Sequence, residues 1–253
     1  MVKQRIWRIG MVLGLLAWGL MGCAARPSAE VITVATDATW PPFEYVDADS
    51  KAIVGFDVDL MRAIAAAAGF EVRIVNVSWD ALLAGVAQGE YDAAISVITI
   101  TPERQQQMLF SAPYYNAGQV IVVRSDETAL QFPADLAGRR AGAQLGTTGA
   151  LEIEKVPGAL LKTYDTIDLA FLDLLNGQID AVVVDNPLAQ GYVARYAGKL
   201  RIVGAPFTDE WYGIAVAPGR TDLLERINRG LQQVQASGQF AALEQQWLTG
   251  TQP

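Results

Sequence analysis

The sequence contains no histidine and only one cysteine among its 253 residues. Without histidine the chain lacks the commonest general base and the commonest metal ligand, so no metal, cofactor or catalytic residue is expected. A single cysteine cannot form an internal disulfide. With 27 acidic and 19 basic residues and no basic run, the chain is also a poor candidate for binding nucleic acid.

The first 22 residues have the pattern of an export signal. Three basic residues precede an apolar stretch at residues 9–20, which is shorter than the roughly 20 residues that span a bilayer. The sequence Leu-Met-Gly-Cys that ends at Cys23 resembles the lipobox of bacterial lipoproteins, in which Met21 is unusual. We expect a signal peptide over residues 1–22, lipidation of Cys23 and a lipidated linker over residues 23–30. The alternative is an ordinary cleaved signal with an unmodified cysteine.

Short β-branched runs alternate with helical stretches along the rest of the chain, which is typical of an α/β fold with mostly parallel strands. Strands are expected at residues 31–35, 71–76, 93–97, 119–124, 140–144, 181–184, 200–203 and 212–217. Helices are expected at residues 57–68, 79–88, 148–156, 166–176, 187–196 and 221–246, the last broken near Gly238.

Two stretches, residues 118–121 and 207–212, look like crossings between two lobes. The first lobe would then hold both ends of the exported chain, and the second lobe the middle. We therefore expect lobe one at 31–118 and 212–253 and lobe two at 119–211.

The run Thr-Ile-Thr-Pro-Glu-Arg that ends at Arg104 places a cation where a helix favours an anion. Thr101 suits the N-cap position and Pro102 the first helical position, so Arg104 falls at the third. That position favours Glu or Gln, and the helix dipole there repels positive charge. A functional reason would be that the guanidinium and the free N–H groups of the helix start receive a carboxylate. The alternative is a surface arginine paired with Glu103 or Glu90.

Polar and aromatic residues gather where the predicted strands end, which is where α/β sheets bind ligands. The loop after the first strand carries Asp37 and Trp40 and is stiffened by two prolines that follow them. After the sixth strand, Asn186 is expected to cap the next helix with Pro187 as its first residue, which leaves Asp185 free to face a ligand. Taken singly, each aspartate has the alternative of an ordinary turn or cap residue.

The strand-end loops together favour one kind of ligand. A Gly-Thr-Thr-Gly run containing Thr147 and Thr148 begins a helix and offers backbone N–H groups to an anion. Arg104 and Asp185 offer one cation and one anion, and Trp79 offers a large ring whose alternative place is the core. A free α-amino acid needs both charged partners a short distance apart. The sequence therefore predicts an amino-acid site.

In these residues the sequence resembles the bacterial extracellular solute-binding proteins of the polar amino acid family, the receptors of ABC importers. The run Gly-Phe-Asp-Val-Asp-Leu at 55–60, with Ile64 and Ala65, fits the family signature G-F-D-x-D-L. Within it Gly55 is expected to turn the chain and Asp57 to cap the helix. Further matches follow in chain order: Ala35-Thr36-Asp37 with Pro42-Phe43-Glu44, the run from Thr99 to Arg104, Phe110-Ser111 with Pro113-Tyr114-Tyr115, residues 146–149, and Asp180-Ala181-Val182 with Asp185.

The resemblance covers essentially the whole exported chain and implies a two-lobe periplasmic-binding-protein fold. Two crossing strands would join lobes that close over the ligand. Arg104 would take the α-carboxylate with help from Thr99 and Thr148, while Asp185 and Ser96 would take the α-ammonium. The complete set of residues carried over as ligand-binding is Asp37, Trp40, Trp79, Ser96, Thr99, Arg104, Gln144, Thr147, Thr148 and Asp185.

The side-chain end of the implied pocket favours a cation. Trp40 and Trp79 would sandwich the ligand side chain, with Asp37 at its far end. Gln144 occupies a position where glutamine binders of this family carry a lysine. A neutral Gln144, an anionic Asp37 and two electron-rich rings suit a cationic side chain. Arginine or lysine therefore leads, with glutamine or histidine next.

The resemblance implies that hinge closure captures the amino acid and presents it to the permease of an ABC importer. We expect a monomer on the outer face of the membrane or in the periplasm, anchored through Cys23. One alternative is an enzyme on the same scaffold, similar to a dehydratase of cyclohexadienyl acids, with Asp37 or Glu44 as its acid or base. Another is a ligand sensor that feeds a separate membrane receptor.

Overall fold

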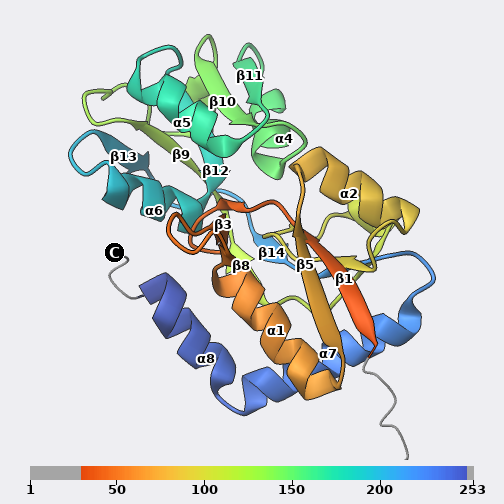
Figure 1. Ribbon diagram of the computed structural model, residues 1–253. Coiled ribbons are helices and arrows are strands. Elements are labelled where there is room, and N and C mark those ends of the chain that lie inside the picture. The colour runs from red at the N-terminus through yellow and green to blue at the C-terminus, as the bar shows by residue number, and fades with distance from the viewer. Residues whose placement is uncertain (1–29, 250–253) are drawn as a thin grey trace, which may run out of the picture.

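The computed structural model describes residues 30–249, which form two lobes, each built on a five-stranded sheet (Figure 1). The first sheet has the strand order β5-β1-β6-β15-β7 and the second β11-β10-β12-β9-β13. We call the part built on the first sheet lobe I and the part built on the second lobe II. The predicted two-lobe α/β architecture is confirmed.

Lobe I combines a mixed sheet with helices from both ends of the described chain. In its sheet β1 runs parallel to β5 and β6, while β15 runs antiparallel to β6 and β7. The strands are β1 (Val31–Thr36), β5 (Glu71–Asn76), β6 (Ala93–Ala94), β7 (Leu109–Phe110) and β15 (Ala215–Val216). The helices are α1 (Phe56–Ala68), α2 (Trp79–Gln88), α3 (Pro102–Gln105), α7 (Thr221–Ala236) and α8 (Gln239–Glu244), followed by a π-helical turn (Gln245–Thr249).

Helices α1 and α7 lie side by side although they come from opposite ends of the sequence (Figure 1). Their close approach depends on Gly230, because a Cβ atom there would lie 2.7 Å from the backbone oxygen of Ile64. A small three-stranded sheet, β2 (Thr39–Trp40), β3 (Glu44–Val46) and β4 (Ile53–Val54), precedes α1. Among residues 30–249, no helix is both long and apolar enough to cross a membrane.

Lobe II is a second mixed sheet flanked by helices from the middle of the chain. Its strands are β9 (Gln119–Arg124), β10 (Arg140–Gln144), β11 (Leu160–Tyr164), β12 (Ala181–Asp185) and β13 (Leu200–Val203). Its helices are α4 (Thr148–Glu154), α5 (Ile167–Leu175), α6 (Asn186–Arg195) and a 3₁₀ turn (Pro133–Leu136). Strand β12 is buried along its whole length, which explains its unbroken apolar Ala-Val-Val-Val run.

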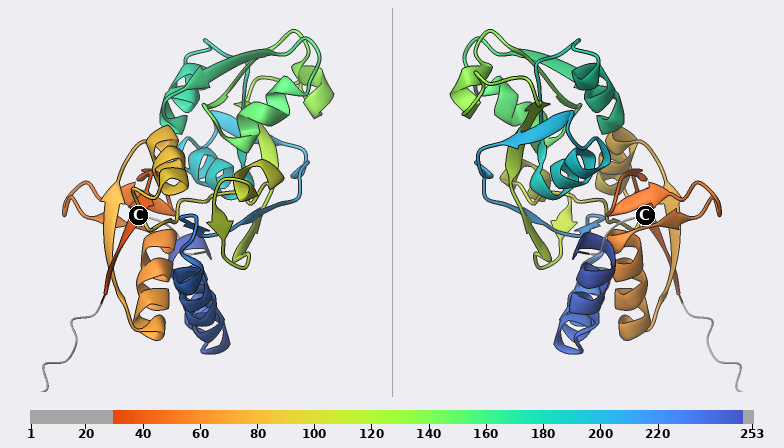
Figure 2. Two further views of the ribbon diagram at one scale, coloured as in Figure 1. Left: turned by 90° about the vertical axis from the view of Figure 1, so that its right-hand side faces the viewer. Right: turned by 90° about the vertical axis from the view of Figure 1, so that its left-hand side faces the viewer.

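Two adjacent segments join the lobes, and both pass through a two-stranded antiparallel ladder of β8 (Tyr115–Ala117) and β14 (Glu210–Tyr212). They pack tightly, because a Cβ atom on Gly118 would lie 2.4 Å from the backbone oxygen of Thr208. The N–H of Gln119 donates to the Thr208 hydroxyl at 2.8 Å. Figure 2 shows the lobes on either side of this ladder. The residue boundaries predicted for the two lobes, which place the hinge in these segments, stay a prediction.

The elements differ from the sequence-based expectation in several places. The strand expected at 93–97 stops at Ala94, and the chain then enters the left-handed region at Val97 (φ 45°). The strand expected at 212–217 is split between β14 and β15 at Gly213. Strands β7, β8 and β11 and the small β2–β4 sheet were missed. The expected break at Gly238 is confirmed, with φ at 80° between α7 and α8.

Candidate functional site

A small cavity lies between the lobes and collects most of the predicted ligand-binding residues. Its lining comes from the strand ends and helix starts of both lobes: Trp40, Trp79, Val97, Thr99, Arg104, Thr147, Thr148 and Asp185. Seven of these were predicted, and Val97 was not. The cavity volume is about 10 Å³, roughly what one water molecule needs. In this arrangement the cavity therefore has no room for an amino acid.

Arg104 reaches across the cleft from the helix start that the sequence predicted. The Thr101 hydroxyl accepts the Arg104 backbone N–H at 3.2 Å, and Pro102 is the first helical residue. The guanidinium donates to the backbone oxygen of Thr99 in lobe I at 2.8 Å and to the backbone oxygen of Gly146 in lobe II at 3.2 Å. Among the described residues, no ion pair joins Arg104 to Glu103 or Glu90.

The electrostatic setting of Arg104 is dominated by burial. Burial lowers the pKa of its guanidinium to about 10, and the nearby charges of Asp185 and Glu210 partly offset that effect. The guanidinium carbon also lies 5.2 Å from the centre of the Trp79 ring. A desolvated cation held between two lobes is a strong partner for a carboxylate.

Asp185 ends β12 and faces the same cavity. Its side chain makes no cap hydrogen bond, although the residue stands at the N-cap position of α6. The expectation that Asn186 caps this helix was wrong: Asn186 is already helical, because the backbone turns into α6 one residue earlier than predicted. The Asp185 Oδ1 atom accepts from the Gln119 amide at 3.0 Å. Burial, reinforced by the charge of Glu210, raises the pKa of Asp185 to about 7.

The other end of the cleft is bridged by an amide. Gln144 of lobe II donates from Nε2 to Asp37 Oδ2 at 2.9 Å and accepts from the Trp40 indole N–H at 2.8 Å. Asp37 also accepts from the Thr39 hydroxyl at 3.0 Å. Burial raises the pKa of Asp37. The Trp40 and Trp79 rings lie 6.5 Å apart at an angle of 30°.

The structure places Ser96 beneath the cavity rather than in its lining. The Ser96 hydroxyl accepts the Asp37 backbone N–H at 3.0 Å and donates to Glu44 at 2.8 Å. Both of its ordinary hydrogen-bonding roles are therefore used inside lobe I. Thr147 also has a partner within the protein. Its hydroxyl donates to the backbone oxygen of Gln144 at 2.7 Å, and the same side chain caps α4.

The Gly-Phe-Asp-Val-Asp-Leu run supports the site from below. Gly55 turns the chain as expected, with φ at 134°, and a Cβ atom there would lie 2.1 Å from the Phe43 oxygen. Asp57 was expected to cap α1, and this was wrong, since α1 already begins at Phe56. Its buried carboxylate instead accepts the Val97 N–H at 2.9 Å and the Tyr114 hydroxyl. Burial raises the pKa of Asp57 to about 7.

Sequence reasoning missed one acidic residue of the site, Glu210. Its Oε2 atom accepts from the hydroxyls of Thr99 at 2.9 Å and Thr148 at 2.7 Å. The Glu210 side chain is 8% exposed. The sequence did contain a hint of this residue, because the acid lies within the predicted crossing at 207–212 and next to two large aromatic residues. No local rule links it to threonines that are 111 and 62 residues away.

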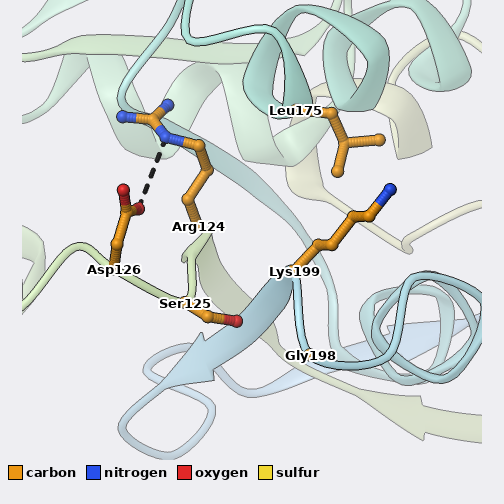
Figure 3. A pocket seen from close by; sticks show the side chains of 6 residues that line it. All are labelled: Arg124, Ser125, Asp126, Leu175, Gly198 and Lys199. Carbon is orange, nitrogen blue, oxygen red and sulfur yellow. Dashed lines mark ion pairs between the residues drawn. The ribbon is translucent and has the colours of Figure 1, made fainter.

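A larger surface pocket of about 290 Å³ lies in lobe II, away from these residues (Figure 3). Arg124, Asp126, Leu175 and Lys199 contribute side chains to it. The Arg124 guanidinium is already used by the backbone oxygens of Leu174 and Ile179 and by Asp126. The pocket brings together none of the predicted site residues, so the smaller inter-lobe cavity is the candidate site. Residues 30–249 contain no group of three acidic, cysteine or histidine side chains placed to hold a metal.

Comparisons with known proteins give one consistent picture. Residues 32–250 match the family described as bacterial extracellular solute-binding proteins, family 3. The ABC transporter arginine-binding protein 1 of Escherichia coli (strain K12) is 36% identical over 244 residues, which cover 94% of this chain and 98% of that protein.

Two solved structures share the fold along most of the chain. A mutant of ArgBP from T. maritima is 41% identical with a TM-score of 0.82, covering 87% of this chain and 96% of that one. The arginine-, lysine-, histidine-binding protein ArtJ from Geobacillus stearothermophilus is 36% identical with a TM-score of 0.82, covering 88% of this chain and 97% of that one.

Proposed function

Because the chain belongs to the bacterial extracellular solute-binding proteins of family 3, we propose that it captures a free cationic L-amino acid for an ABC importer. Arginine or lysine is the leading ligand, with glutamine or histidine next. Members of this family are solute-binding proteins and not enzymes, so the dehydratase alternative is set aside. Membership of this family also assigns the chain to the exported proteins.

The charge of the inter-lobe site is the observation that carries the proposal. Four ionisable groups meet there, of which only Arg104 is cationic, while Asp37, Asp185 and Glu210 are acidic. A cationic amino acid brings one negative and two positive groups. Arg104 would pair with its carboxylate, Asp185 with its ammonium group and Asp37 with its side chain, so the ligand neutralises buried acids rather than adding to them.

The remaining assignments follow the same geometry. Thr99 and Thr148 stand beside Arg104, and their backbone groups would support the ligand carboxylate, because both hydroxyls donate to Glu210. Ser96 would assist Asp185 only after releasing one of its present partners. The rings of Trp40 and Trp79 would lie along the aliphatic part of the side chain and add cation–π attraction. The relatives include proteins named for binding arginine, for binding cystine, and for binding arginine, lysine and histidine, which supports an amino-acid ligand.

Ligand capture requires opening and closing of the lobes. In the described arrangement Arg104 and Gln144 bridge the lobes directly, and the cavity is too small for an amino acid. The lobes would separate at the β8–β14 ladder, admit the ligand and close on it. The extra contacts in the closed form would shift the population toward the state that a permease binds.

Calorimetric titration of the mature protein with arginine, lysine, histidine and glutamine tests the proposal. Citrulline is the matched control, because it has nearly the shape of arginine but no side-chain charge. We expect arginine or lysine to bind with micromolar affinity, equivalent to about −8 kcal/mol, and citrulline at least tenfold more weakly. Equal binding of arginine and citrulline would contradict the cationic assignment, and no binding of any amino acid would contradict the proposed function.

We further propose that Cys23, which lies outside the described residues, carries a lipid anchor. Metabolic labelling with a fatty-acid analogue should mark the wild-type protein and not the Cys23→Ser variant. Equal labelling of both would contradict the anchor.

A further inference from the structure

We propose that Glu210 is a closure latch, a hinge-borne carboxylate that joins lobe I to lobe II through two threonine hydroxyls. The latch concerns the movement of the lobes and rests on the proposed function only where ligand release is measured. It gives a role to a buried acid for which the amino-acid pocket itself has no assignment.

The position of Glu210 in the fold supports this role. It is the first residue of β14, one of the two strands that run between the lobes. Its Oε1 atom accepts from the Thr208 hydroxyl at 3.0 Å, so the carboxylate is held by the hinge segment itself. Its neighbour Asp209 differs, because within residues 30–249 the Asp209 carboxylate accepts only from the exposed Asn116 amide of the hinge.

The partners of the other carboxylate oxygen come from both lobes. Thr99 follows β6 in lobe I and pairs with Tyr212 in an isolated bridge. Thr148 is the first residue of α4 in lobe II. One atom, Glu210 Oε2, accepts from both hydroxyls at 2.9 Å and 2.7 Å. Separation of the lobes must break at least one of these bonds, so the bond that breaks stabilises only the closed arrangement.

The latch also decides how the two hydroxyls can treat a ligand. A threonine hydroxyl has one hydrogen, and a carboxylate can only accept. Thr99 and Thr148 donate their hydrogens to Glu210, and the Thr148 oxygen accepts from the Gln119 amide at 3.1 Å. Neither hydroxyl then has a hydrogen for the ligand carboxylate, which depends on Arg104 instead. A bound carboxylate and the latch therefore do not compete for the same donors.

The central experiment compares Glu210→Gln with Asp209→Asn. The two variants remove the same charge from adjacent residues of the hinge, but only Glu210 contacts both lobes. Small-angle X-ray scattering of the mature protein without amino acid reports the fraction of closed molecules. Stopped-flow displacement reports how fast bound arginine, or whichever amino acid binds best in the titration, is released.

We expect Glu210→Gln to enlarge the radius of gyration and to speed release about tenfold, the size of one charge-assisted hydrogen bond. Asp209→Asn should match the wild type in both readouts. Thr148→Val, which removes only the lobe II donor, should act in the same direction as Glu210→Gln. The double variant should be little worse than Glu210→Gln alone, because both changes break the same bridge.

If Glu210→Gln has the scattering curve and release rate of Asp209→Asn, the latch is refuted while the proposed function stands. If no amino acid binds the wild type, the proposed function fails, and the scattering comparison still decides the latch. Circular dichroism controls for folding of each variant. Should Glu210→Gln misfold, Thr148→Val carries the same comparison, and an unchanged radius of gyration would overturn the proposal.

Discussion

The two ends of the inter-lobe cleft are bridged by different chemistry. At one end, ionisable groups face each other: Arg104 reaches a lobe II carbonyl, and the Glu210 carboxylate binds a hydroxyl from each lobe. At the other end the neutral amide of Gln144 is bonded to Asp37 and to Trp40. In the proposed function, the charged end would meet the carboxylate and ammonium that every α-amino acid shares, whereas the amide end would meet the side chain that distinguishes one amino acid from another.

This difference separates affinity from selectivity. Changes at the charged end should weaken all amino acids together, because the α-carboxylate and α-ammonium do not vary. Changes at the amide end should alter the order of ligands, because Asp37 is the only acidic group bonded to Gln144 there. The predictions below test that separation, beginning with the largest expected effect.

Replacing Arg104 by alanine should strongly weaken the binding of every amino acid. The ligand carboxylate would be left buried without a cation, which costs roughly 2 to 5 kcal/mol, or about 30-fold to several thousand-fold in the dissociation constant. Titration calorimetry with arginine, lysine and glutamine measures the loss. Arg62→Ala is the matched control, because the Arg62 guanidinium is exposed and pairs with Asp59 on the outer face of α1. Near-normal affinity of Arg104→Ala would contradict its assigned role.

Binding should weaken as the pH falls below about 7, the pKa of Asp185. A protonated Asp185 cannot pair with an ammonium group, so the dissociation constant should rise by up to about tenfold per pH unit for this one group. Asp185→Asn should remove that dependence and weaken all amino acids at pH 8. A pH profile that is the same in wild type and Asp185→Asn would contradict the assignment.

The same raised pKa has the opposite effect on the unliganded protein. Protonated Asp185 tolerates burial better than the ionised form, so its contribution to stability is fully present below the unfolded pKa and is lost as pH rises through about 7. Burial is the main cause of this raised pKa, and the charge of Glu210 adds to it, while Tyr212 and Arg104 act in the opposite direction. Thermal unfolding without ligand should show a loss of stability as the pH rises from about 4, near the ordinary pKa of an aspartate, to about 7. Asp185→Asn should reduce that loss.

Replacing Asp37 by asparagine should change selectivity more than affinity. Arginine and lysine should lose about tenfold in affinity with the loss of their charged partner, whereas glutamine should change little. Competition titrations with arginine and glutamine measure the ratio. Asp49→Asn, at an exposed loop position, controls for net charge. Equal losses of affinity for arginine and glutamine would show that Asp37 does not recognise the ligand side chain.

Replacing Gln144 by leucine should have the smallest effect on a cationic ligand. The variant leaves the Trp40 N–H unpaired and takes one donor from Asp37. A bound cation can replace that donor, so arginine should weaken by no more than about threefold, while glutamine weakens more. The same competition titrations show the difference. If arginine loses more than glutamine, the amide end contributes to affinity as well as to selectivity.

Local rules predicted the parts of the site that local backbone determines. Arg104 was found from a helix start of six residues, and its Thr101 cap is present as expected. The same kind of rule failed at Asp57 and Asn186, because each helix begins one residue earlier than its sequence pattern suggests. A shift of one residue turns Asp57 from a cap into a buried acceptor for Tyr114, which is 57 residues away.

The overall fold could be predicted because the hydrophobic periodicity and the resemblance to the family both extend along the whole chain. The alternation of strands and helices predicted an α/β fold, and the resemblance implied its two lobes, although very short strands such as β2 and β7 carry too few residues to show a period. Glu210 was out of reach for a different reason. Its role depends on the distance between two lobes, and no pattern along one strand encodes that distance.

The hydrogen bond from Trp40 to Gln144 gives the molecule an intrinsic optical signal. Indole emission depends on whether the ring is shielded or meets water, and the Trp40 ring is buried with its N–H bonded to the opposite lobe. Separation of the lobes would expose that ring and move its emission to longer wavelength. Each cycle of capture and release would thus change the colour of the protein's own ultraviolet fluorescence, without any attached dye.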